Sequence, residues 1–280
     1  MKQLLFFGLS VWLSGFCTAA ELLVVTSIRP LALLAGEILG DDGRVESILP
    51  GNTSPHHYAL KVSDMARLQK ADLVLWVGPA LERFLVKPLQ TVAEERRLTL
   101  AATETLKQSI EGAGKDPHIW LSPRNGILMA GAIAEQLSLT APASAEIFRQ
   151  RAKDLITRLH RLDAQLQRRF ATLTEKGFGV YHNGYSHFVQ AYGLHQIVAV
   201  TETPERPPGA RHLYEVRRQL GEKNANCLFI EPYYRSKAAE NLAADLGLPL
   251  FSLDPLGMEA TTYEGLLNQL AEGFSKCLSE

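Results

Sequence analysis

The chain contains 280 residues, of which 46% are hydrophobic and 21% charged, and its formal net charge is −1 at pH 7. This composition excludes a disordered chain, which needs low hydrophobicity and high net charge, and it argues against a nucleic-acid partner, which favours a basic domain. Three cysteines are too few for a small scaffold held together by disulfides, and the length suits one large or two ordinary domains.

The N-terminus has the pattern of a secretory signal peptide. Lys2 gives a short basic start, an apolar run follows over residues 4–16, and small residues at 18–20 precede a charged residue. The run is too short to span a bilayer of about 30 Å comfortably, and the bulky Phe16 before Cys17 argues against a lipoprotein anchor. We therefore expect cleavage after position 20 and an exported, untethered protein.

Removal of this segment would leave two cysteines, Cys227 and Cys277. An even pair in an oxidising compartment is a candidate disulfide, and two buried free thiols are the alternative. A bond between them would close a loop of about fifty residues, for which chain-entropy arithmetic gives a stabilisation of roughly 4 kcal/mol.

Apolar strands alternate with helices on both sides of the chain's middle. In the first half the predicted strands are 22–26, 45–49 and 71–77, and the predicted helices are 31–39, 65–69 and 126–137. In the second half the predicted strands are 179–181, 197–200, 227–230 and 250–253, and the predicted helices are 185–192, 213–221, 236–246 and 263–277. Strands that are apolar on both faces and alternate with helices are typical of a parallel sheet covered by helices.

One long amphipathic segment separates these halves. Its apolar residues recur at steps of three and four from Phe148 to Leu173, and the segment contains no glycine or proline. At 1.5 Å per residue, thirty helical residues would extend roughly 45 Å. We interpret the segment as a rigid helix that joins two α/β lobes, and a coiled-coil dimerisation helix is the alternative. The predicted organisation is a signal peptide at 1–20, an N-terminal lobe at 21–142, a linking helix at 143–175 and a C-terminal lobe at 176–280.

Four potential metal ligands lie where a binding site of an open α/β sheet would form, beyond the carboxyl ends of strands. His56 follows a predicted strand, His118 precedes a helix, and His182 and Asp254 each directly follow a strand. Three imidazoles and one carboxylate suit a borderline ion such as zinc, with His57 as an alternative or auxiliary ligand. The spacings are long and irregular, and the chain has no H-E-x-x-H or C-x-x-C motif, so the residues alone leave the metal open.

Five ordered segments carry a family resemblance over essentially the whole exported chain. They are 51–64 (GNTSPHHYALKVSD), 71–84 (ADLVLWVGPALERF), 116–123 (DPHIWLSP), 182–194 (HNGYSHFVQAYGL) and 227–257 (CLFIEPYY to LDPLG). The chain resembles the solute-binding proteins of zinc and manganese ABC transporters, most closely the periplasmic zinc branch. This resemblance implies two lobes, each with a parallel sheet, and a metal site in the cleft between them. The family's ligand positions fall on His56, His118, His182 and Asp254, and water is the alternative to Asp254 as the fourth ligand.

The resemblance also implies a function. We expect a monomer without enzymatic activity that captures Zn²⁺ and delivers it to a membrane permease with a cytoplasmic ATPase. Manganese-binding relatives typically carry a carboxylate at the position of His182, and manganese prefers oxygen, so the imidazole favours zinc. The pair Cys227 and Cys277 also matches the zinc branch, where a disulfide is known at this place. The alternatives are a manganese or iron protein of the same family and a zinc hydrolase with Glu231 as general base.

A departure from many zinc members concerns the loop ahead of the second ligand. That loop is long and rich in histidine and acidic residues in those relatives, whereas residues 111–115 here are short and contain no histidine. We therefore do not expect an auxiliary zinc site in this loop.

Overall fold

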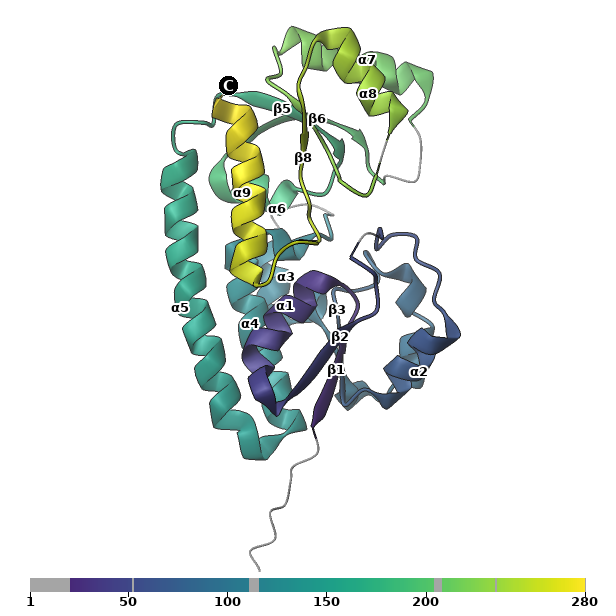
Figure 1. The fold of residues 1–280 in the computed structure, drawn as a ribbon, viewed down its shortest axis with the longest axis vertical. Coiled ribbons are helices and arrows are strands. Elements are labelled where there is room, and N and C mark those ends of the chain that lie inside the picture. The colour runs from purple at the N-terminus through teal and green to yellow at the C-terminus, as the bar shows by residue number, and fades with distance from the viewer. Residues whose placement is uncertain (1–20, 52, 111–115, 204–207, 235, 280) are drawn as a thin grey trace, which may run out of the picture.

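The structure is a computed structural model that describes residues 21–279 except 52, 111–115, 204–207 and 235. The predicted signal peptide and the short loop at 111–115 lie outside the described residues. The fold class is confirmed, because the chain forms two parallel four-stranded sheets flanked by helices (Figure 1). Among the described residues, no helix combines the length and the apolar character that a membrane crossing requires.

The N-terminal sheet has the strand order β2-β1-β3-β4, and all neighbouring strands are parallel. Its strands are β1 (Leu22–Thr26), β2 (Gly43–Ser47), β3 (Leu73–Trp76) and β4 (Arg97–Thr99). The central strands β1 and β3 are almost wholly buried, as expected for strands covered by helices on both faces. The helices of this lobe are α1 (Arg29–Leu39), α2 (Val62–Lys70), α3 (Glu104–Ile110) and α4 (Pro123–Thr140).

A fully buried carboxylate, Glu82, fixes the turn after β3. It accepts hydrogen bonds from the Ser27 hydroxyl (2.5 Å) and from the backbone N–H groups of Val77 (3.0 Å) and Gly78 (2.8 Å). Burial raises the pKa of Glu82 to about 7, although these hydrogen bonds oppose the shift. The carboxylate therefore joins the ends of β1 and β3 at the edge of the sheet that faces the other lobe.

The long helix α5 (Ala145–Phe170) runs along one side of the molecule (Figure 1). It is shorter than the predicted span of 143–175, because a short 3-10 turn at Pro142–Ser144 precedes it and the helix ends at Phe170. Its buried stripe consists of Phe148, Ala152, Leu155, Leu159, Leu162, Leu166 and Phe170. The helix packs on α4 and α1 and on the C-terminal helix. The stripe is thus covered within the chain, and it does not supply the seam that a coiled-coil dimer needs.

The C-terminal sheet has the strand order β6-β5-β7-β8, again with parallel neighbours. Its strands are β5 (Gly177–His182), β6 (His195–Thr201), β7 (Leu228–Ile230) and β8 (Leu250–Ser252). The helices of this lobe are α6 (Ser186–Tyr192), α7 (Ala210–Glu222), α8 (Lys237–Leu246) and α9 (Tyr263–Ser279). Helix α9 contacts β5 and β8 as well as α1 and α5, so the last helix packs on both lobes.

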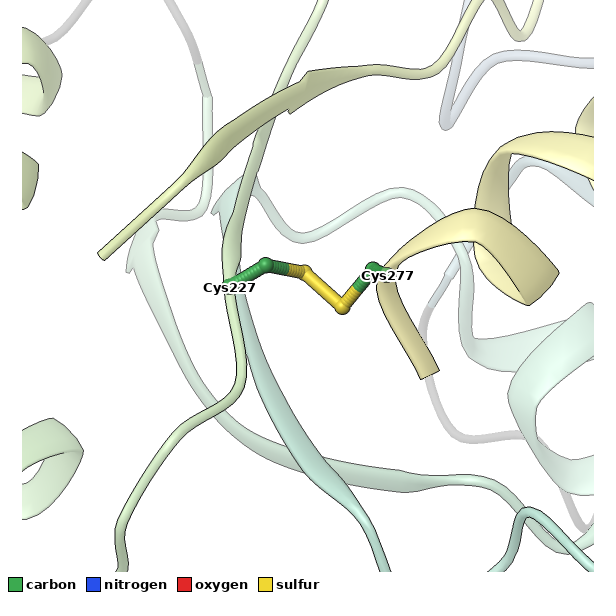
Figure 2. The surroundings of a disulfide bond; sticks show 2 residues. All are labelled: Cys227 and Cys277. Atoms are coloured by element: carbon green, nitrogen blue, oxygen red, sulfur yellow. A yellow bond between two sulfur atoms is a disulfide. The ribbon is translucent and has the colours of Figure 1, made fainter. Parts of the chain in front are cut away.

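The disulfide between Cys227 and Cys277 is confirmed. It joins the residue before β7 to the last turn of α9, with an S–S distance of 1.99 Å and a Cα–Cα distance of 5.9 Å (Figure 2). Both cysteines are fully buried. The cross-link therefore fastens the end of α9 to the centre of the C-terminal lobe.

Candidate metal centre

Three of the four predicted ligands come together between the lobes. His56 lies in the loop between β2 and α2, His118 directly precedes the 3-10 turn Ile119–Leu121, and His182 is the last residue of β5. Each imidazole offers a nitrogen that lies within 4.8 Å of those of the other two. The Nε2 atoms of His56 and His118 are 3.2 Å apart. The N-terminal lobe thus supplies two of these imidazoles and the C-terminal lobe one.

Burial and crowding characterise these imidazoles, and they favour the neutral form of His56 that a metal ion needs. His118 and His182 are 2% and 3% exposed, and His56 is partly buried. Burial lowers the pKa of His56 to about 2, and the neighbouring rings of His118 and His182 lower it further by repulsion. A neutral imidazole at His56 can offer its ring nitrogen to a cation that lies among the three histidines.

A buried carboxylate lies behind each of the two most buried imidazoles. Asp116 Oδ1 is 2.6 Å from His118 Nδ1, and Glu231 Oε1 is 2.8 Å from His182 Nδ1. Since an ionised carboxylate only accepts, each Nδ1 carries the proton and each Nε2 keeps its lone pair; this tautomer is assigned from the partners. Burial raises the pKa of Asp116, but the hydrogen bonds from His118 and the attraction between the carboxylate and this imidazole when it is protonated outweigh burial, so the net shift is downward. Such carboxylate–imidazole pairs orient metal ligands.

A glycine makes room for two of the imidazole rings. A Cβ atom at Gly184 would lie 3.1 Å from Cε1 of His182 and 3.2 Å from Cε1 of His118, closer than ordinary van der Waals contact. The loop after β5 can approach both rings only because this position has no side chain.

Asp254, the fourth predicted ligand, makes a different set of contacts. Its Oδ1 accepts from the backbone N–H groups of Leu256 (2.9 Å) and Gly257 (3.0 Å), and its Oδ2 accepts from Met258 (2.6 Å). Among the described residues, the potential ligands that lie within 4.8 Å of one another are the three histidines, without Asp254 or the exposed His57. The carboxylate of Asp254 closes the turn that follows β8.

The comparisons with known proteins agree with this architecture. The model of a family described as "Zinc-uptake complex component A periplasmic" matches residues 24–277. The chain belongs to this family.

Similar proteins support membership of the zinc-uptake family along the whole chain. The high-affinity zinc uptake system protein ZnuA of Yersinia pestis is 34% identical over 92% of this chain and 92% of its own. The protein of the same name from Haemophilus ducreyi is 30% identical over 97% of this chain and 98% of its own. The crystal structure of a ZnuA deletion mutant with zinc bound has a TM-score of 0.81 at 26% identity, and the match covers 93% of this chain and 99% of that chain.

Membership of the zinc-uptake family rules out the hydrolase alternative. The position of Glu231 in the structure also argues against a role as general base. A general base would have to lie beside a metal-bound water. Glu231 instead pairs with Nδ1 of His182, on the side of the ring away from Nε2. Sequence reasoning singled out Glu231, as the possible general base of a hydrolase, but it did not single out Asp116. The signal was available, because the carboxylate stands two residues before His118 in the segment Asp-Pro-His.

Proposed function

We propose that the exported chain captures Zn²⁺ in the periplasm and delivers it to the permease and ATPase of an ABC transporter. The observation that carries this proposal is the cluster of His56, His118 and His182 in a member of the zinc-uptake family. In the proposal, residues 1–20 direct export and are removed, and the chain acts as a monomer with lobes at 21–142 and 176–280.

The ligand set that we propose consists of these three histidines and Asp254. Neutral imidazole favours zinc over manganese, which prefers oxygen donors. An Asp254 oxygen that caps a turn keeps lone pairs, so the carboxylate can approach the ion after a small movement of the turn. Four protein ligands would close the coordination shell, and a closed shell suits carriage of the ion rather than activation of a water.

Contacts between the lobes limit how far the cleft can open in this mechanism. Arg158 on α5 forms ion pairs with Glu37 on α1 and with Glu264 on α9, the latter at 2.6 Å. Arg29 at the start of α1 donates to the carbonyl oxygens of Gly257 (2.9 Å) and Ala260 (2.5 Å). We infer that binding and release use small tilts and loop movements rather than a wide hinge.

The test is a zinc titration of residues 21–280 by competition with a chromophoric chelator. H118A and H182A should each weaken binding by more than about 100-fold, because loss of a ligand exceeds the effect of losing a residue behind one. H160A, on the exposed face of α5, is the matched control and should leave the affinity unchanged. Undiminished zinc affinity in H118A and H182A, or tighter binding of manganese than of zinc by the unaltered protein, would overturn the proposal.

A further inference from the structure

Asp116 contacts both lobes at once, beside the metal centre. Its Oδ1 accepts from His118, from the ring Nδ1 and also from the backbone N–H (2.9 Å), within the N-terminal lobe. Its Oδ2 accepts from the backbone N–H of Ser186 at 2.8 Å, and its backbone carbonyl lies 2.9 Å from Nε2 of His187. Ser186 and His187 are the first two residues of α6 in the C-terminal lobe. The Asp116 side chain is almost completely buried, so these contacts are shielded from water.

A buried hydrogen-bond chain fixes the direction of the contact with His187. Asn125 Nδ2 donates to the carbonyl of Ile119 (3.0 Å) and lies 3.3 Å from Nδ1 of His187. The hydroxyl of Ser109 donates to Asn125 Oδ1 at 2.8 Å, which sets the orientation of the amide. Since Asn125 presents an N–H to Nδ1 of His187, the proton of this imidazole is on Nε2. His187 therefore donates to the carbonyl of Asp116.

The other carboxylate of the centre has no such role. Glu231 and His182, which it holds, both belong to the C-terminal lobe, so their pairing does not join the lobes. Asp116 and Glu231 thus each accept from Nδ1 of a histidine, but only Asp116 also contacts the other lobe. Glu231 therefore serves as the control for the contact between the lobes.

We propose that Asp116 is a positioning residue that ties His118 to helix α6, so that the metal centre is assembled before the ion arrives. The inference rests on the proposed function, because it takes His118 as a zinc ligand. Pre-organised ligands bind an ion without first being ordered, which strengthens binding. Separation of the lobes would remove the two donors of α6 that hold Asp116 and would thereby loosen His118. Opening of the cleft at α6 and weakening of the metal centre are therefore one event.

The test compares D116N with E231Q in the protein of residues 21–280, without zinc and with zinc. The amide of D116N has one oxygen, so it can satisfy either His118 or the N–H of Ser186 but not both. Spin labels attached through K87C and K223C, two exposed positions in different lobes, report the interlobe distance by pulsed electron resonance. D116N should broaden the distance distribution without zinc and recover the narrow one with zinc. The distance distributions of E231Q and of the labelled protein without either substitution should be narrow both with and without zinc.

Zinc affinity and a second pair of variants complete the test. D116N and E231Q should both lose about 10- to 100-fold in affinity, the range typical of residues behind ligands. H187A should broaden the interlobe distance like D116N, whereas H187Q retains an N–H near the position of Nε2 and should stay narrow. A D116N distribution as narrow as that of the unaltered protein would overturn the proposal even if H118A abolishes binding. Full zinc affinity in H118A would instead overturn the proposed function.

Discussion

Removal of the disulfide is expected to destabilise the protein by an amount that follows from its place in the chain. Cys227 and Cys277 are 50 residues apart in the sequence. For a closed loop of this size the loss of chain entropy in the unfolded state is about 14 cal/mol/K, which corresponds to about 4 kcal/mol at 25 °C. The end of α9 is buried in the C-terminal lobe, so packing holds this helix in the folded state without the bond. The bond is therefore expected to act mainly by restricting the unfolded chain.

The assay is scanning calorimetry of the metal-free protein of residues 21–280. Unfolding entropy of about 2.1 cal/mol/K per residue gives about 0.55 kcal/mol/K for about 260 residues, so 4 kcal/mol corresponds to a decrease of about 7 °C in Tm. The variant is C227A/C277A, and the control is the unaltered protein in reductant, which keeps both side chains and loses only the bond. Metal must be absent because zinc would raise Tm by mass action.

The two samples separate the cross-link from side-chain packing. Reduced protein and C227A/C277A should both melt about 7 °C below the oxidised protein, with the double variant slightly lower because it loses buried sulfur. If Tm of the reduced protein is less than about 2 °C below that of the oxidised protein, the reasoning is refuted, because the bond would then not restrict the unfolded chain.

Three further predictions concern single side chains. Glu82 has a folded pKa of about 7 against 4.5 in the unfolded chain, so its contribution to stability is present below pH 4.5 and is lost as the pH rises through 7. E82Q should therefore gain stability relative to the unaltered protein by up to about 3 kcal/mol between pH 4.5 and pH 8 in urea titrations, and a constant difference would contradict this. G184A should weaken zinc binding by about tenfold through contact with two ligand rings, whereas G131A, which has open space in α4, should leave the affinity unchanged. The pKa of His56 is lowered to about 2, so this residue should make the metal-free protein lose stability as the pH falls below 6.5, by at most about 1.4 kcal/mol per pH unit. In urea titrations H56A should reduce this dependence, and an unchanged dependence would contradict the prediction.

Short elements at the edges of the fold escaped the sequence prediction. β4 has only three residues, all half-buried, and α3 has seven residues that are mostly exposed, so neither contains enough buried positions to display a period. The second strand was predicted at 45–49 and runs over Gly43–Ser47, because Ile48 and Leu49 are buried beyond its end. Edge strands and their neighbouring turns take their place from tertiary contacts, which a local pattern does not contain.

The sequence by itself determined the alternation of buried strands and helices, the long helix, the pair Cys227 and Cys277, and the three candidate histidine ligands. These features depend on local periodicity and on residue chemistry, which can be recognised in a single sequence. Only the tertiary structure decided that Asp116 contacts Ser186, 70 residues away, and that Asp254 closes a turn while the histidines gather. The reason is physical: hydrogen bonds of buried carboxylates depend on where distant backbone groups lie once the two lobes have packed against α5 and α9.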